Sequence, residues 1–221
     1  MRKTTKALQQ KTEKVSEDAQ RVVVAPPRMD HALITLRGTA PFVGNRFPHG
    51  ALETMRRNQE LGQVARGKKV RIPKNFNELH KQHIHFSEQG WPGIPASAFR
   101  SALIDACRLV GYAMTKAKMS IFILADGLDQ DDGQPLVRIY GDMRSFEMPV
   151  RLANGSADIA VRPQWLKWSV KLGIEWDCDQ FDRSDVVNLT LRAGKQVGVG
   201  AGRPNSKTSH GMGWGTWEIS T

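Results

Sequence analysis

The alternation of side chains over residues 167–176 (KWSVKLGIEW) constrains the fold more than any other feature of the chain. Apolar residues alternate without a break with polar or small ones, which is the period of a β-strand that buries one face. Such a strand needs neighbouring strands and an apolar layer over one side of the sheet. The buried face is predicted to consist of Trp168, Val170, Leu172, Ile174 and Trp176, and the opposite face of Lys167, Ser169, Lys171, Gly173 and Glu175.

Weaker patterns predict the elements around this strand. A run that begins with Ala98, Phe99 and Ala102 has helical spacing, and Asp182, or Ser184 close by, is suited to cap a second helix. In chain order the predictions are a strand over 31–37, a helix over 96–110, a strand over 119–124, one or two strands over 136–152, the strand over 167–177, a helix over 184–196 and a strand over 214–219. This β-α-β-β-α-β order with insertions predicts an α+β, ferredoxin-like (RRM-like) domain.

The 221 residues are predicted to form one domain rather than two. Residues 1–28 are rich in basic side chains, contain few large apolar ones and end at two prolines, which predicts a basic, flexible N-terminal arm. Residues 29–221 then form the single domain. Within it, residues 44–92 lack a clear period and are predicted to be a long basic insertion.

Positive charge is the main constraint on function. The chain has 32 Lys and Arg residues against 22 Asp and Glu, a formal net charge of +10 and a pI of about 9.9. This balance favours polyanions such as nucleic acid. The alternatives are a solvated charge run, an interface with an acidic partner, and a basic protein without a specific partner. The cations of the insertion that would reach along a phosphate backbone are Arg46, Arg56, Arg57, Arg66, Lys68, Lys69, Arg71 and Lys74.

Three segments carry a resemblance to a known family. They are residues 93–103 (GIPASAFRSAL), the glycine-rich residues 198–215, and residues 31–44, which end in TAPFVG. Together they resemble the RAMP superfamily, the repeat-associated proteins that include the backbone subunits of CRISPR effector complexes. The first segment is similar to the Ile-Pro-Gly-Ser-Ser-Leu-Lys-Gly-Ala-Leu-Arg stretch that opens the first helix of such proteins, and Ala96 and Ser101 stand where the family usually has Gly.

The resemblance covers residues 30–45 and 90–219, and it implies a function. It implies a protein that binds single-stranded RNA or DNA without sequence preference and oligomerises along the strand, as a subunit of a ribonucleoprotein does. The C-terminal pattern also resembles small phage-encoded proteins. Members that cut target RNA carry an acidic residue in the loop after the first strand, whereas residues 39–50 contain none. We therefore expect a binding protein and not an enzyme.

The glycine-rich loop has a physical rationale of its own. Closely spaced glycines let backbone N–H groups approach phosphate oxygens, and Arg203 and Lys207 add positive charge beside them. A loop that only turns the chain is the alternative. Trp91 and Trp214 lie beside glycines and are expected to stack on bases, and Arg100 on the first predicted helix adds a cation. The glycines of the predicted site are Gly198, Gly200, Gly202, Gly211, Gly213 and Gly215.

The sequence patterns that could indicate a metal, a cofactor or catalysis are less specific than those that indicate nucleic-acid binding. The segment HKQHIH offers His80, His83 and His85, but His-x2-His-x-His alone is nonspecific, so no metal site is predicted. A Gly-x4-Gly-Lys-Ser/Thr pattern is absent, and no cofactor is predicted. His49 and His210 are the candidate general bases of an alternative function, a RAMP-like endoribonuclease. A structural or virion assembly protein without nucleic acid is the third class.

The remaining features bear on location and partners. Cys107 and Cys178 lie far apart and in no metal-binding spacing, which fits a reducing compartment. No apolar stretch approaches the ~20 residues that cross a bilayer. We therefore expect a protein of the cytoplasm, in a bacterial or phage-infected cell, without a membrane partner. The expected partners are single-stranded nucleic acid and further copies of the same chain.

Overall fold

The computed structural model describes residues 24–60, 75–151, 155–207 and 211–220. Its main sheet has the strand order β11-β1-β10-β7-β4-β3, with β5 also paired to β10 and β6 to β7. All of these pairs are antiparallel. The strands are β1 (Met29–Gly38), β3 (His85–Phe86), β4 (Pro92–Pro95), β5 (Ile121–Leu124), β6 (Gly127–Leu128), β7 (Pro135–Tyr140), β10 (Ser169–Asp177) and β11 (Trp217–Ile219).

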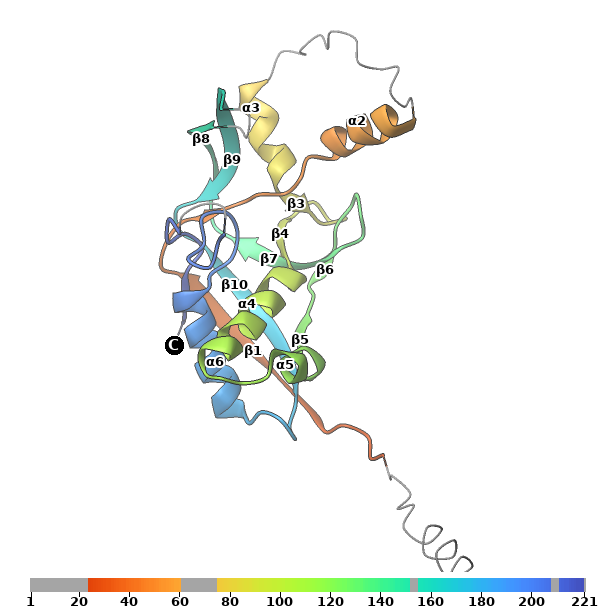
Figure 1. Cartoon of the computed structure of the whole chain (residues 1–221), viewed down its shortest axis with the longest axis vertical. Helices are drawn as coiled ribbons and strands as arrows, with labels where there is room; N and C mark the ends of the chain where they lie inside the picture. The colour runs from red at the N-terminus through yellow and green to blue at the C-terminus, as the bar shows by residue number, and fades with distance from the viewer. Residues whose placement is uncertain (1–23, 61–74, 152–154, 208–210, 221) are drawn as a thin grey trace, which may run out of the picture.

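Helices α4 (Ala96–Leu109) and α6 (Arg183–Gln196) lie side by side on one face of this sheet (Figure 1). Asp182 caps α6, because its side chain accepts a hydrogen bond of 2.7 Å from the N–H of Asp185 while the Asp185 carboxylate accepts one of 3.1 Å from the N–H of Asp182. A short helix, α5 (Met114–Ser120), leads from α4 into β5. The prediction of an α+β fold with these two long helices is confirmed.

The core lies between the sheet and the two helices. The alternating apolar residues of 167–176 are all at most 3% exposed, as the sequence predicted. Leu36 from β1 and Phe99 from α4 are fully buried, and the Phe99 ring meets the Trp217 ring edge-on with 5.7 Å between centroids. This packing joins the first strand, the first long helix and the last strand into one unit.

The described part of residues 44–92 is more regular than the sequence indicated. It contains α2 (His49–Glu60), α3 (Phe76–Leu79), the 3-10 helix η2 (His80–His83) and β3. Its end belongs to the domain, since β3 pairs with β4 and both Ile84 (2% exposed) and Trp91 (8% exposed) are core residues. These apolar residues are too far apart in the sequence to produce a period, so only the tertiary structure reveals their burial.

A second sheet has the strand order β2-β9-β8 and consists of β2 (Phe42–Val43), β9 (Ala157–Trp165) and β8 (Met143–Arg151). The sequence did not predict β9, because Pro163 argues against a strand that is paired on both sides. The last strand also begins later than predicted. The N–H of Trp214 donates to Gly202 (3.1 Å) and that of Gly215 to Pro41 (2.8 Å), so these residues belong to a loop.

The elements outside the main sheet and its two long helices lie mostly at one end of the molecule. Figure 1 shows α2, α3 and the β8–β9 hairpin at one end, while residues 24–28 run away from the body at the opposite end. Within the described ranges, no helix is both long and apolar enough to span a membrane.

Candidate functional site

Two adjoining pockets form one groove across the start of helix α4. One pocket is lined by residues of the β2–α2 connection and of η2, and the other by the polar side of α4. We call this surface the α4 groove. Its residues include Gly44, Arg46, His83, Ser97 and Ser101, and the residues that line both pockets are Pro95, Ala98, Gly200 and Arg203.

Helix α4 begins at this groove without a side-chain cap. Its N-cap residue is Pro95, which makes no side-chain cap hydrogen bond to the first turn. The first N–H groups of a helix have no acceptor within the helix, and the helix dipole adds partial positive charge at the same end. Ser97 and Ala98 place this first turn in the groove wall. The start of α4 is therefore suited to an anion such as phosphate.

The described part of the glycine-rich loop, residues 198–207 and 211–215, is tightly bonded and is not an open cradle. The N–H of Val199 donates to Gly215 (3.0 Å), and that of Ala201 donates to Val43 (2.9 Å). Several glycines are needed for packing, since a Cβ on Gly200 would lie 2.6 Å from the Phe42 ring and one on Gly215 would lie 1.8 Å from the Val199 carbonyl oxygen. The N–H groups of Val199 and Ala201 make these bonds and are not available to a phosphate. The predicted contact between backbone N–H groups and phosphate is therefore restricted to other N–H groups of the loop.

All six glycines of the prediction adopt positive φ, which L side chains rarely tolerate. They therefore have a structural role, whether or not the loop also contacts a ligand. Arg203 is the cation that this loop brings to the groove. Its Nη1 donates to the carbonyl of Gly200 at 3.2 Å, which orients the guanidinium.

Arg46 also lies at the groove, but its charge is already paired. Its side chain is 10% exposed and contacts Asp129 at 3.2 Å and Asp131 at 2.8 Å. Asp129 is buried, with His85 Nδ1 2.7 Å from its Oδ2 and the N–H groups of Asp131 and Asp132 bonded to its Oδ1. Arg46 is therefore part of an internal polar network and not a free phosphate contact.

The environment of Asp129 lowers its pKa. Burial by itself raises the pKa of the carboxyl, but the hydrogen bonds from Asp131, His85 and Asp132 and the charge of Arg46 outweigh burial. The sequence pattern around Asp129 indicates only a turn, and Asp129 was not predicted as important. Its role depends on Arg46 and His85, which are distant in the sequence.

The three histidines of HKQHIH have three different environments. His80 is buried, and its Nδ1 has no hydrogen-bond partner among the described residues. His83 has a pKa that is lowered by burial and by the nearby Arg162 guanidinium, against a hydrogen bond to the Arg46 carbonyl that raises it. The ligand atoms of His85, Asp129 and Asp132 lie within 4.8 Å of one another, so these three are the described residues that could hold a metal. Arg46 and His85 already contact the Asp129 carboxylate, and the positive charge of Arg46 opposes the binding of a metal cation there.

The remaining predicted cations are dispersed. Arg56 and Arg57 lie on the exposed helix α2, where Arg56 pairs with Glu60 at 3.1 Å. Arg100 Nε donates to the Ile121 carbonyl (2.9 Å), so Arg100 ties α4 to β5. Lys207 is exposed next to the loop. Some of the predicted site residues lie outside the described residues, namely Arg66, Lys68, Lys69, Arg71 and Lys74. The candidate base His210 also lies outside them.

Neither tryptophan chosen for stacking presents an open ring. Trp91 is buried, its indole N–H donates to Gln89 at 2.9 Å, and the Arg138 guanidinium lies 5.9 Å from its ring centroid. Trp214 is partly buried and meets Phe146 edge-on at 5.6 Å. Their proximity to glycines reflects close packing, since a Cβ on Gly202 would lie 2.6 Å from the Trp214 ring.

On the sheet face opposite α4 and α6, the two central strands carry no Phe, Tyr or Trp, but the exposed Phe122 on β5 and Tyr140 on β7 lie on this face, since they pair with Glu175 and Ser169. On this face β1 carries His31, Leu33, Thr35 and Arg37, and β10 carries Ser169, Lys171, Gly173 and Glu175. Aromatic residues at such positions can stack on bases. The α4 groove differs from this face because it joins the first turn of α4 to Arg203 and the glycine-rich loop, and it is the candidate phosphate site.

A scan against protein-family models finds no match for this chain, and a search of the curated proteins finds none.

Proposed function

We propose that this protein binds single-stranded RNA or DNA without sequence preference and holds the phosphate backbone in the α4 groove. The observation that carries the proposal is that residues 93–103 and the glycine-rich loop, which are about a hundred residues apart in the chain, form the walls of one groove. An uncapped helix start and Arg203 meet there. Both features favour phosphate over the base edges.

The connectivity of the main sheet supports a ferredoxin-like domain related to the RAMP superfamily. Strand β1 leads through α4 to β5, and β10 leads through α6 to β11, while in the sheet these four strands have the order β11-β1-β10-β5. This is the β-α-β-β-α-β arrangement with the remaining elements as insertions. Two of the three segments that carry the family resemblance, residues 93–103 and the glycine-rich loop, meet at the start of the first long helix.

The proposed protein acts in several copies and without catalysis. A single small binding fold covers ~4–16 nucleotides, so sequence-independent coverage of a long strand needs many copies. The alternative base His49 is exposed and lies 3.5 Å from the exposed Glu53 on its own helix, which gives a general base no buried partner. A labelled RNA that is cut by the wild type and not by His49→Ala would contradict the non-catalytic assignment.

Affinity for a single strand is expected to fall steeply with salt. The net charge of +10 favours binding through released counterions, and each neutralised phosphate adds ~0.7 to the slope of log K against log salt for single strands. Fluorescence anisotropy with two unrelated oligonucleotides of equal length measures this slope. We expect equal slopes and affinities for both sequences. An affinity that does not change between low and physiological salt would contradict phosphate binding.

Ser97→Glu is expected to weaken binding while it leaves the fold intact. Ser97 is exposed in the first turn of α4, where a carboxylate is favourable to the helix but repels a phosphate in the groove. Loss of one charge-assisted contact corresponds to an affinity loss of about tenfold or more. Arg203→Ala is expected to have an effect of similar size for the same reason.

Ser184→Glu is the matched control for this measurement. Ser184 is the second residue of α6 as Ser97 is of α4, it is also exposed, and it lies outside the α4 groove. Both changes lower the net charge by one. Equal losses of affinity in the two variants would show that only net charge matters, and the α4 groove would then be the wrong site.

A further inference from the structure

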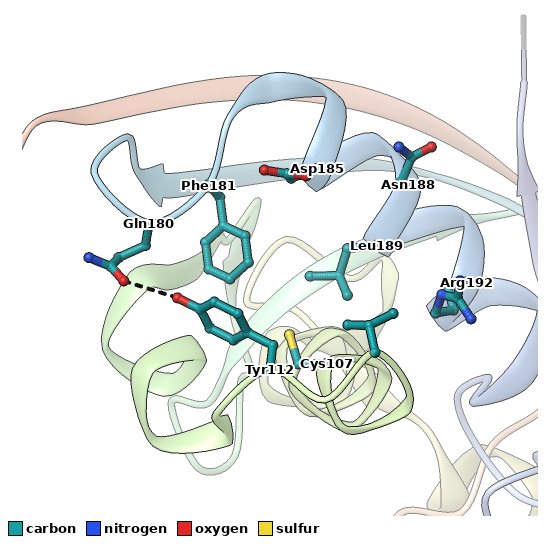
Figure 2. A pocket seen from close by; sticks show the side chains of 9 residues that line it. Cys107, Tyr112, Gln180, Phe181, Asp185, Asn188, Leu189 and Arg192 are labelled. Carbon is teal, nitrogen blue, oxygen red and sulfur yellow. Dashed lines mark hydrogen bonds between the residues drawn. The ribbon is translucent and has the colours of Figure 1, made fainter.

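A second pocket lies between the far ends of α4 and α6, away from the α4 groove. Figure 2 shows Cys107 and Tyr112 on one side of it and Phe181 and Leu189 on the other. The Tyr112 hydroxyl donates to Oε1 of Gln180 at 3.0 Å, and the rings of Tyr112 and Phe181 lie 4.9 Å apart. We call it the Tyr112 pocket. Its inner surface is apolar, and hydrogen-bonding groups lie at its edge.

The apolar lining of the Tyr112 pocket continues onto the surface. Val110 lines the pocket and is 55% exposed, and its neighbour Leu109 is 54% exposed. An apolar recess with an exposed apolar margin is typical of a surface that a partner covers. The described part of the chain places no side chain over it that would remove this exposure.

The surface beside the pocket is acidic, although the protein is basic overall. Residues 177–185 (DCDQFDRSD) carry four aspartates against one arginine, and Asp185 lines the pocket itself. Arg28 neutralises one of the four by pairing with Asp179, and Arg192 is the cation among the lining residues. A partner that is both apolar and basic fits this surface by charge.

The N-terminal segment has this composition. Residues 1–23 carry six Lys and Arg against three Asp and Glu, and residues 22–24 are three successive valines. Val24 is 86% exposed. The segment leaves the domain at Arg28, whose carbonyl accepts a hydrogen bond of 2.7 Å from the N–H of Cys178. Residues 24–28 then point away from their own domain (Figure 1).

We propose that residues 22–24 of one copy bind in the Tyr112 pocket of a neighbouring copy, with the basic residues before them over the acidic residues 177–185. Pro26 and Pro27 favour an extended backbone, which directs residues 24–28 away from their own domain. Residues 22–28 span at most ~20 Å, which is enough to reach across to an adjacent domain.

This contact is head-to-tail, because each copy offers an arm at one place and a pocket at another. Such a contact repeats and produces a ring or an open helix. The inference rests on the proposed oligomerisation and is independent of the α4 groove. Its test therefore uses the full chain after nuclease treatment, free of nucleic acid.

Analytical ultracentrifugation of the wild type and three variants tests the proposal. The arm variant carries Val22→Asp, Val23→Asp and Val24→Asp, and the pocket variant carries Val110→Glu and Asn188→Trp, both at exposed lining positions. The control is Leu191→Glu, at a residue of α6 that is 42% exposed and does not line the pocket. We expect the wild type and the control to form oligomers and the arm and pocket variants to be monomers.

Mixing the two monomeric variants is the decisive step. Equal amounts of the arm and pocket variants are expected to form a dimer, because one intact arm then meets one intact pocket and the contact cannot repeat. A monomeric wild type at tens of micromolar, an arm variant that oligomerises as the wild type does, or a mixture that stays monomeric would each overturn the proposal. If the pocket variant fails to fold by circular dichroism, the arm variant decides the question alone.

Binding of an oligonucleotide too short for two copies separates this proposal from the previous one. Both variants are expected to bind it with no loss beyond that caused by their lower net charge, since neither change touches the α4 groove. The Ser97→Glu variant is expected to lose that binding but to form oligomers. This result would show that the α4 groove binds the oligonucleotide and that oligomerisation does not depend on it.

Discussion

Asp129→Ala is expected to lower the free energy of unfolding by about 3–5 kcal/mol, the cost of removing one partner from a buried ion pair. Asp129 has a fully buried side chain and accepts hydrogen bonds from Arg46, His85 and two backbone N–H groups. Without the carboxylate, the largely buried Arg46 guanidinium keeps its contact with Asp131 and a long hydrogen bond of 3.5 Å to the Ile84 carbonyl. Urea denaturation followed by circular dichroism measures the difference.

The exposed Asp132 is the control for this change. Its carboxylate accepts a hydrogen bond from the N–H of Gln134 at 3.0 Å, so Asp132→Ala removes one exposed interaction and is expected to cost about 1 kcal/mol or less. Equal costs for the two variants would show that the network around Asp129 adds no stability beyond a surface turn.

The stability difference between the wild type and Asp129→Ala is also expected to depend on pH. The pKa of Asp129 is lowered in the folded protein, so the ionised carboxylate contributes stability above the unfolded pKa of about 3.9. This contribution is lost as the pH falls from there through the folded pKa. The difference in unfolding free energy should therefore be constant near neutral pH and become smaller below about pH 4.

Gly215→Ala is expected to destabilise the protein by about 3 kcal/mol or more. The residue has a φ of +65°, which costs an L-alanine ~1 kcal/mol or more. The new Cβ would also lie 1.8 Å from the Val199 carbonyl oxygen. Relief of this clash requires movement of Gly215, which receives a hydrogen bond from Val199 and donates one to Pro41. Thermal or urea unfolding measures the loss.

Gly213→Ala separates the steric cost from the conformational one. Gly213 has a similar φ of +75°, but nothing lies within 4 Å of the position of a Cβ there. We expect this variant to lose only the conformational part, about 1–2 kcal/mol. A Gly215→Ala variant as stable as Gly213→Ala would mean that the loop is loose, and the structural role assigned to its glycines would be wrong.

The elements that the sequence predicted are those in which a local period reports burial directly. Three such patterns are the alternation over residues 167–176 and the helical spacing after Pro95 and after Asp182. Each belongs to one regular element with one buried face, so the positions of its apolar residues show which side chains are buried. The α+β composition and the cap of the second long helix at Asp182 followed from these patterns. The positive charge was equally evident, since net charge does not depend on folding.

Only the tertiary structure decided which residues share a surface. Trp91 and Arg46 look available in the sequence, but Trp91 is in the core and Arg46 is paired with Asp129, 83 residues away. The sequence did not predict strand β9, because Pro163 has a low strand propensity. In the structure, pairing with β8 and β2 outweighs this local preference. The α4 groove exists because the start of a helix and a distant loop pack together. Burial, ion pairing and groove formation depend on contacts between distant segments, which a local pattern cannot encode.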